Sequence, residues 1–595
     1  MTIRRRYAAV SAVAAGALLL TGCGSAGGGG DDEDAGAGEA TAEEFADTIT
    51  IGIEQTPDAY NSNTADANSV YNTYVNNITQ SDFVKVQPDG TVEPNEALGT
   101  YEKTSDDPLT VEYTFADDAV WSDGTPIDFD DALLAWAAYS GTHPSGETDA
   151  DGNPVDLFNA ASTNGWAEVE MPEGEAGDKS FTMVFKNPYA DWEVLGAGFM
   201  PAHIAAEQGG LSVEDDGAAL VDAITNNDTA ALTPVAEFWN TGWAYQANLP
   251  ELPDPALIPS SGPYKLDNAS NGTLTLVRND QWFGEEAKTE TIVFKTVDAN
   301  EMVQALQNGE IDQFDPSNAT KDMLDQLEAL GDTVEVETGE SLTFSHIDLD
   351  TSATGVFNDQ RVRQAFAKCV PREELVDKFA RPVYPEAQVL KLHEILPAQA
   401  EYEEAVTQVP SANEYDEVDL EGAKALLAEA GVTTPLTVRF TFSEQSSLRA
   451  DQVALVKASC DQAGFNIEAK PDPDVFTSLA SAPGTWDAAV FGWAGSGLIA
   501  SGQSIYITGG NQNYGKYTNP EVDRIWGELV QVTDPADALP LQIELEEQLW
   551  SNLYNVTLYA NPGMSAWSSS LEGPVYNPTQ YGGTWNAETW TKSLS

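Results

Sequence analysis

Few side chains in this 595-residue chain are spaced like catalytic or metal-binding groups. The four histidines, His143, His203, His346 and His393, form no i, i+4 pair and have no cysteine at zinc-ligand spacing. The sequence also contains no GxSxG, no Walker loop and no GxGxxG after a predicted strand. We therefore expect no catalytic residues, no metal site and no cofactor.

Carboxylates are the most abundant titratable groups, with 96 Asp and Glu against 27 Lys and Arg and a formal net charge of −69. An acidic surface repels phosphate backbones, so we expect no nucleic-acid partner. Glu310 and Asp312 stand close enough in sequence to suggest an acid–base pair, but with so many carboxylates chance proximity explains them better. An extracellular hydrolase using paired carboxylates is the alternative from another functional class, although no motif selects two of them.

The N-terminus has the pattern of an export signal. Three arginines at 4–6 precede an apolar stretch at 7–20, which is shorter than the roughly 20 residues that span a bilayer. The sequence LTGC at 20–23 resembles a bacterial lipobox, which implies cleavage before Cys23 and a lipid on its sulfur. An ordinary secretory peptide is the alternative. Residues 23–45, rich in Gly, Ala, Asp and Glu, are expected to form a flexible tether.

Two cysteines remain in the exported part of the chain, Cys369 and Cys460. Both lie on predicted helices of the same lobe, in a compartment where thiols can pair. We predict that they form a disulfide.

The stretch from Val111 to Tyr139 predicts a strand, a turn and a helix. Alternating apolar residues indicate the strand, and Asp123-Gly124 indicates the turn. Asp128 is a plausible N-cap for the helix that follows. The apolar positions expected to share one helical face are Phe129, Ala132, Leu133 and Trp136.

This stretch resembles the signature of family 5 extracytoplasmic solute-binding proteins, the peptide-binding group of ABC importers. The matching residues are Val120, Trp121, Asp123, Gly124, Pro126 and Asp131. Further segments that resemble the family are SGPY at 261–264, GEID at 309–312, RVRQAFAKCVPREELV at 361–376 and NYGKYTNPEVD at 513–523. Pro371 stands where the family usually has Asp. The resemblance extends over about Thr48 to Trp590.

The resemblance implies an α/β protein with a two-lobed periplasmic-binding-protein-like fold of class II type and an additional smaller domain. Repeated strand–helix alternation along the chain agrees with parallel α/β units. The expected divisions are a signal peptide at 1–22, the tether at 23–45, domain I at 46–85, 258–342 and 551–595, domain II at 86–257, and domain III at 343–550.

The resemblance also implies a ligand site between the lobes. Trp493 ends an apolar strand in the family's Gly-Trp element, which borders the ligand, although a core tryptophan is the plain alternative. Ser496 stands where peptide-binding members carry an Asp that pairs with the peptide's amino terminus. The other candidate ligand-binding residues are Tyr60, Asn63 and Asp66 in the loop after the first strand, Asn513, Tyr514 and Tyr559.

The function that this resemblance implies is that of a monomeric, lipid-anchored binding component outside the cell membrane. It would capture oligopeptides in the cleft and deliver them to an ABC permease, with lobe closure presenting a new surface. An oligosaccharide is the second ligand class, because Trp and Tyr faces stack on sugar rings and Ser496 removes the expected carboxylate. A lipoprotein sensor without transport is a third alternative.

Overall fold

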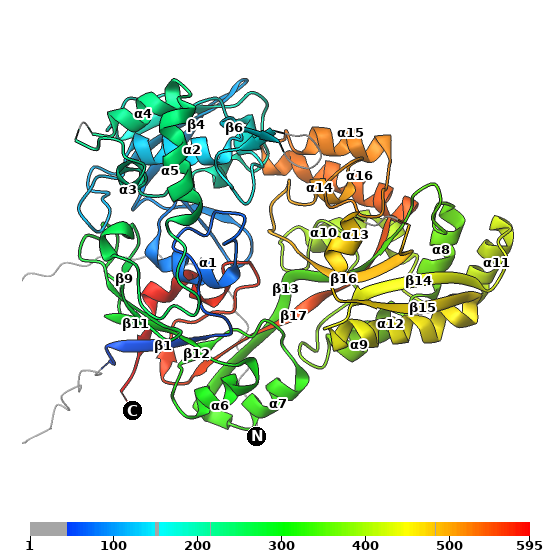
Figure 1. Ribbon diagram of the computed structural model, residues 1–595. Helices are drawn as coiled ribbons and strands as arrows, with labels where there is room; N and C mark the ends of the chain where they lie inside the picture. The colour runs from blue at the N-terminus through cyan, green and yellow to red at the C-terminus, as the bar shows by residue number, and fades with distance from the viewer. Residues whose placement is uncertain (1–44, 149–153, 215, 482–483, 595) are drawn as a thin grey trace, which may run out of the picture. The chain divides into compact units, whose positions relative to one another are not determined.

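The computed structural model describes residues 45–148, 154–214, 216–481 and 484–594 (Figure 1). The predicted export signal and Cys23 lie outside the described residues. Within them, no helix is both long enough and apolar enough to cross a membrane.

A ten-stranded mixed sheet organises the described chain. Its strands, in spatial order, are β15 (Phe465–Asp472), β14 (Leu436–Ser443), β16 (Ala488–Ala494), β13 (Val334–Leu349), β17 (Asn555–Ser568), β12 (Gln313–Phe314), β1 (Thr48–Ile53), β11 (Thr291–Thr296), β10 (Thr273–Arg278) and β9 (Tyr264–Ser270). The sheet therefore carries strands from both ends and from the middle of the sequence.

Two long antiparallel strands, β13 and β17, join the two ends of this sheet. Val334 at the start of β13 pairs with Ser568, and Asp348 near its end pairs with Asn555. The second half of β13 also pairs with β16, where Phe344 lies opposite Trp493. Strands of 16 and 14 residues reach across both halves of the sheet, as Figure 1 shows.

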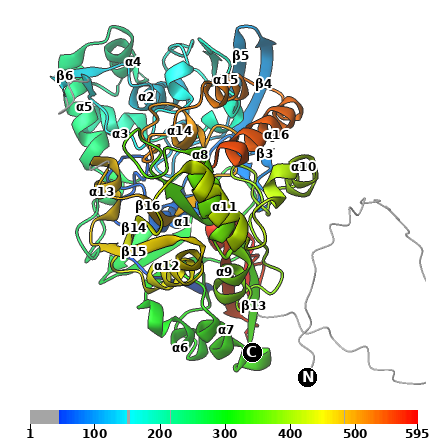
Figure 2. The same cartoon turned by 90° about the vertical axis from the view of Figure 1, so that its right-hand side faces the viewer.

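Helices cover the β14–β15 end of the sheet (Figures 1 and 2). β14 runs parallel to both β15 and β16, the arrangement expected for α/β units. The helices of this region are α8 (Gln360–Cys369), α9 (Arg372–Phe379), α10 (Tyr402–Gln408), α11 (Leu420–Ala430), α12 (Ser447–Cys460) and α13 (Val475–Ser481). A disulfide joins Cys369 of α8 to Cys460 of α12 with a Cα–Cα distance of 4.9 Å, which confirms the predicted pairing.

A smaller sheet and a helical layer form around the stretch from Val111 to Tyr139. The sheet contains β4 (Gly99–Asp106), β5 (Leu109–Phe115) and β8 (Ser180–Val184). The neighbouring helices are α2 (Phe129–Tyr139), α3 (Ala202–Gln208), α4 (Ala218–Thr225) and α5 (Thr229–Thr241). The predicted strand, turn and helix are all present.

Helix α2 differs from the amphipathic helix that the sequence predicted, because every one of its residues is buried, Asp130 and Asp131 included. Asp131 is accommodated because its carboxylate accepts the backbone N–H groups of Ala202 and Asp128 at 2.8 and 3.1 Å. It also accepts the indole N–H of Trp121 at 3.2 Å. Asp131, in the first turn of α2, is therefore a buried hydrogen-bond acceptor.

Further helices and strands belong to the described chain. They are α1 (Val70–Thr79), β2 (Val84–Val86), β3 (Val92–Pro94), β6 (Pro144–Thr148), β7 (Pro154–Asp156), α6 (Met302–Gln307), α7 (Lys321–Glu328), α14 (Gln503–Tyr506), α15 (Pro520–Leu529), α16 (Pro535–Asn552), β18 (Leu571–Glu572) and β19 (Thr591–Lys592).

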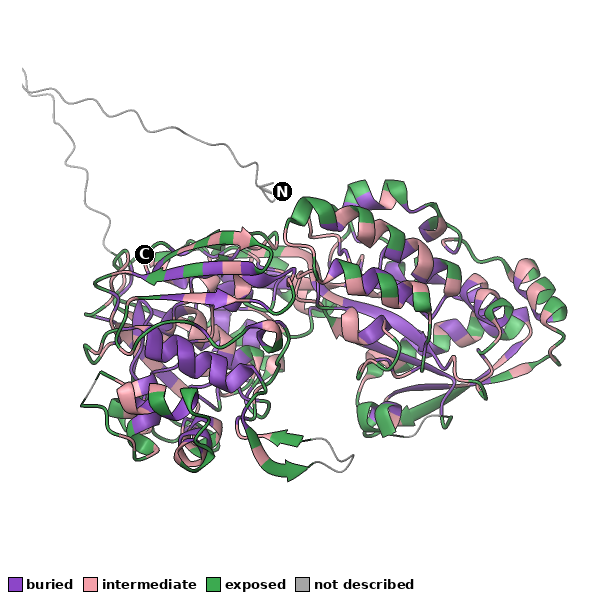
Figure 3. Ribbon diagram, turned by 90° about the horizontal axis from the view of Figure 1, so that it is seen from above, coloured by how far each residue is buried: buried purple, intermediate pink, exposed green. Residues whose placement is uncertain are grey.

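The apolar core falls into separate clusters. The largest one draws its residues from 49–294 and 567–590, and another draws them from 342–559. Figure 3 shows the buried residues following the strands, with exposed residues on the outer sides of many helices. Separate cores in one chain agree with the expected two-lobed α/β fold.

Candidate ligand-binding site

The carboxyl ends of β14 and β16 define one edge of the sheet. The two strands are parallel, with Phe440 opposite Ala488. β14 leads through a short loop into α12, and β16 leads past Trp493 into the loop that contains Ser496. Ligands of α/β sheets bind at such an edge, since the loops leaving parallel strands gather there.

Trp493 and Tyr514, two of the candidate ligand-binding residues, lie together at this edge. Their ring centroids are 5.9 Å apart and their planes differ by 21°. His346 lies on the other strand next to Trp493, with centroids 5.9 Å apart and an angle of 12°. Trp493 is half-buried, so this row of aromatic rings retains accessible surface. It can offer flat apolar contact to a ligand.

A buried ionisable pair lies next to the aromatic row. His346 and Asp348 are both fully buried, and His346 Nε2 is 3.3 Å from Asp348 Oδ1. Neither ring nitrogen makes a hydrogen bond of good geometry to a described residue. Packing therefore fixes the position of the His346 ring, which lies against the ring of Trp493.

On the opposite face of β13 and β16, a polar network surrounds Arg449 in the first turn of α12. Nη1 of Arg449 donates to Ser345 Oγ at 2.7 Å and to Gln452 Oε1 at 3.0 Å. The amide of Gln452 in turn donates to the hydroxyl of Tyr559 at 2.6 Å. Burial lowers the pKa of Arg449 and raises that of Tyr559.

Of the residues in this network, Tyr559 alone was predicted from the sequence. Arg449, Ser345 and Gln452 were missed, although one signal was present: Arg449 follows the end of a strand by a few residues, where a site in a parallel sheet is expected.

Ser496 lies in the loop that leaves β16. It is half-buried, and its Oγ accepts the backbone N–H of Leu498 at 3.2 Å, which shapes a tight turn. A short polar side chain at this position carries no charge to offer a ligand's ammonium group.

Asn513 shapes the loop that carries Tyr514. Its amide nitrogen donates to the backbone oxygens of Ile507 and Tyr517 at 2.9 and 2.8 Å, and its amide oxygen accepts the N–H of Tyr517 at 2.8 Å. Both amide hydrogens are therefore used within the loop. Asn513 positions Tyr514, and a direct contact with ligand stays a prediction.

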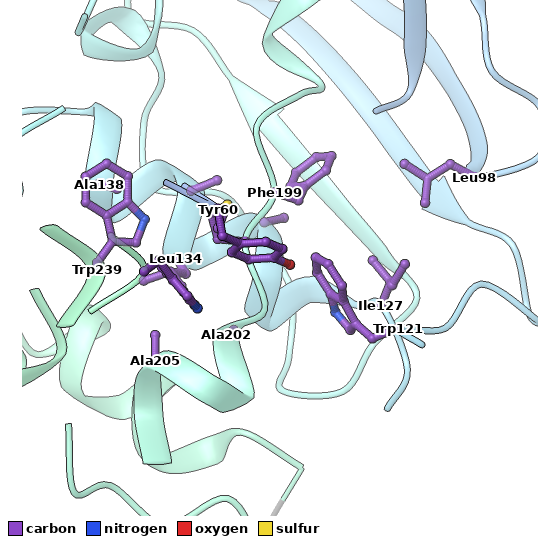
Figure 4. Close-up of a cluster of buried hydrophobic side chains, with 14 of the residues drawn as sticks. Tyr60, Leu98, Trp121, Ile127, Leu134, Ala138, Phe199, Ala202, Ala205 and Trp239 are labelled. Atoms are coloured by element: carbon purple, nitrogen blue, oxygen red, sulfur yellow. The ribbon is translucent and has the colours of Figure 1, made fainter. Parts of the chain in front are cut away.

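The loop after β1 contains the three remaining candidates, and the structure separates them. Tyr60 is buried, its hydroxyl donates to the backbone oxygen of Pro259, and burial raises its pKa well above the usual value. In Figure 4 it lies among apolar side chains such as Leu134 and Phe199. Tyr60 is thus a core residue of this region.

Asp66 and its neighbours instead line a cavity of about 280 Å³. Asp66 is exposed and accepts a hydrogen bond from Asn159 Nδ2 at 3.1 Å. Asn63 keeps its side-chain nitrogen buried without a partner among the described residues. The residues that line the cavity with Asp66 include Asp58, Asn61, Trp243 and Tyr245, and Asn63 is not among them. No hydrogen bond or ring contact between described residues links this cavity to Trp493.

The described residues contain no group of three or more His, Cys, Asp or Glu side chains arranged to hold a metal ion. The site consists of aromatic rings, amides, hydroxyls and one guanidinium. Groups of these kinds can stack on and hydrogen-bond to an organic solute.

The sequence of the chain is similar to that of known solute-binding proteins. The family model described as "Bacterial extracellular solute-binding proteins, family 5 Middle" matches residues 92–515. An uncharacterized lipoprotein of Mycobacterium tuberculosis is 27% identical over 519 residues, which cover 84% of this chain and 86% of the relative. The oligopeptide-binding protein OppA of Mycobacterium tuberculosis is 25% identical over 501 residues, covering 82% and 75%.

The fold is also found among solved structures. The periplasmic EDTA-binding protein EppA superposes with a TM-score of 0.78 at 23% identity, covering 93% of this chain and 98% of EppA. The predicted α/β fold class, that of the two-lobed periplasmic binding proteins, is confirmed.

Proposed function

The chain belongs to the bacterial extracellular solute-binding proteins of family 5, and from that premise we propose that it captures oligopeptides for an ABC importer. The family binds substrates and does not transform them, which fits a site without paired catalytic carboxylates. The observation that carries the proposal is the Trp493–Tyr514 pair at the carboxyl edge of β14 and β16. A peptide can add its backbone there as a strand, with its side chains against the rings.

The likeness to OppA supports a peptide as the ligand. EppA has the same fold and binds EDTA, so the fold alone does not select the solute. Ser496 is the specific observation in favour of a second ligand class. Burying an ammonium group without a carboxylate is costly, and sugar rings stack well on Trp and Tyr. An oligosaccharide is therefore the second candidate.

The lipid anchor at Cys23 is part of the proposal. Cys23 lies outside the described residues, and the support is the LTGC sequence together with relatives that are named lipoproteins. The protein would then act at the outer face of the cell membrane as a monomer, and closure of its lobes would present a surface to the permease. The limits of domains I, II and III stay a prediction.

Mass spectrometry of solute that co-purifies with the native protein tests the ligand class most directly. Calorimetry with a pentapeptide library and with cello-oligosaccharides then measures affinity. We expect peptides to bind without turnover. Binding of sugars alone would contradict the peptide ligand, and turnover of either solute would contradict a binding protein.

A further inference from the structure

Arg449 is half-buried, and no described carboxylate forms an ion pair with it. This is unusual in a chain with a net charge of −69. Other arginines of the same region have an acidic partner or several backbone oxygens as hydrogen-bond acceptors. Arg439 on β14 forms an ion pair with Asp487 at 2.7 Å. Arg363 directs its Nε and Nη1 to three backbone oxygens. Arg449 has neither kind of compensation, although acids are abundant.

The hydrogen bonds of Arg449 leave one edge of its guanidinium open. Nη1 makes both of its bonds, to Ser345 and to Gln452. Among described residues, none accepts from Nε or Nη2. The N–H bonds of Nε and Nη2 point in the same direction, and this pair of donors matches the two oxygens of a carboxylate.

The surroundings of the guanidinium are built to hold it. A Cβ added to Gly492 on β16 would lie 3.0 Å from Nη2, so the absent side chain leaves the room that Arg449 occupies. Ser345 and Gln452 are buried, and each has a second partner: Ser345 Oγ donates to Asn561 Oδ1 at 2.8 Å, and Gln452 donates to Tyr559. This network fixes the orientation of the open edge before a ligand arrives, which reduces the ordering cost of binding.

We propose that Arg449 binds a carboxylate of the ligand side-on, through Nε and Nη2, at the carboxyl edge of β14 and β16. The inference rests on the proposed solute-binding function and narrows its ligand class to solutes that carry a carboxylate. A peptide would present its free carboxyl terminus there. The carboxylate of the ligand supplies the negative charge that no described residue places next to Arg449.

The test compares ligands that differ only in the carboxylate. One pair is a pentapeptide library with free carboxyl termini and the same library with carboxamide termini. The other pair is cellopentaonic acid and neutral cellopentaose. We expect the acid of at least one pair to bind the wild-type protein at least tenfold more tightly than its neutral partner, by calorimetry.

Single-residue variants test whether Arg449 is the source of the preference for the acid. Arg449→Gln should remove the preference for the acid, and Arg449→Lys should restore part of it, because Lys keeps the charge without the paired donors. Gly492→Ala should weaken the preference without abolishing it, since the added methyl group would lie 3.0 Å from Nη2 and shift the guanidinium slightly. Lys424→Gln is the matched control: it removes one positive charge from an exposed residue whose ion pair is with Glu421, and the preference should persist.

Equal binding of acid and neutral partner in both pairs would overturn the inference, and so would a preference that survives in Arg449→Gln. Stronger competition by inorganic phosphate than by acetate would overturn the assignment to a carboxylate. Binding of cellopentaonic acid, with no binding of any peptide, would confirm the carboxylate site and contradict the peptide ligand of the proposed function.

Discussion

The carboxylate of Asp191 holds the backbone of Ala500, which is 309 residues away in the sequence. Asp191 Oδ2 accepts the N–H of Ala500 at 2.8 Å, and Oδ1 accepts that of Ile499 at 2.9 Å. The neighbouring Ala190 donates its N–H to the backbone oxygen of Val530 at 2.8 Å. These bonds tie the segment before Trp192 to the loop that follows Trp493 and Ser496. The shape of the loop after β16 therefore depends on Asp191, whose neighbour Trp192 belongs to the apolar cluster of residues 49–294 and 567–590.

Asp191→Ala should loosen this loop, because the two N–H groups lose a charged acceptor worth about 1.5–3 kcal/mol for each bond. We expect hydrogen exchange at Ile499 and Ala500 to rise at least tenfold and solute affinity to fall. Asp222→Ala, at an exposed residue of α4, is the control and should change neither. Unaltered exchange at both amides would contradict a holding role for Asp191.

Trp493→Ala should weaken solute binding whichever ligand class is correct, because it removes an aromatic face worth about 0.5–1.5 kcal/mol beyond its buried area. Calorimetry on the wild type and the variant measures the loss. Trp282→Ala, at a half-buried tryptophan of the β10–β11 connection, is the control for removing an indole. Identical affinity in Trp493→Ala would exclude Trp493 from the site.

Loss of the disulfide should lower stability without removing the site. Cys369 and Cys460 are buried and 91 residues apart, and closing a loop of that size stabilises by up to about 4.7 kcal/mol in the chain-entropy model. We expect the double variant Cys369→Ala/Cys460→Ala to unfold at lower denaturant concentration and still to bind solute. Two free thiols titrating in the denatured, unreduced protein would show that the bond does not form.

Asp82 should make stability depend on pH in the acid range. Burial raises its pKa from 3.8 to about 6, although the N–H of Gly198 donates to it at 2.8 Å. A raised pKa means that the native state binds the proton more tightly, so this stability is present below the unfolded value and is lost as pH rises through about 6.

The variant Asp82→Asn keeps an acceptor for Gly198 and removes the charge. We expect it to unfold at a higher temperature than wild type at pH above the raised value and at the same temperature near pH 4, roughly the unfolded pKa. Asp117→Asn, at an exposed site, should follow the wild type at every pH. A parallel pH profile for Asp82→Asn and wild type would refute the assignment.

Cys23→Ser should prevent lipidation, because the hydroxyl does not replace the sulfur as the acceptor of lipid. The variant should be released into the medium or stay unprocessed. Partition into the detergent phase, compared with the wild type, is the measurement. Partition identical to the wild type would contradict the lipid anchor.

The local elements of this protein follow from the sequence alone. Helix α11 begins at Leu420 and ends before Gly431, which has a φ of 70°, because glycine accepts that conformation at low cost. The turn at Asp123-Gly124 and the N-cap Asp128 were likewise readable, since both depend on neighbours within a few residues. The pairing of Cys369 with Cys460 followed because few cysteines were available.

Only part of the candidate site could be predicted from the sequence. Trp493 and Tyr514 were selected from sequence and meet in the structure, whereas Tyr60 looked like a cleft residue and lies in the core. The residues next to Tyr60 in the sequence do not indicate that α2 and Trp243 pack around it, because those contacts come from distant segments of the chain.

Tertiary structure alone decided which polar residues act together. Arg449 bonds Ser345 across 104 residues, and Asp191 bonds Ala500 across 309. The pairing of β13 with both β16 and β17 sets which side chains share a face, and the register of strands is fixed by packing of the whole sheet. Sequence patterns report the period of a strand or helix, so they determined the elements and the family. The open edge of Arg449 and the burial of all of α2 arise from the sum of long-range contacts, which no local pattern contains.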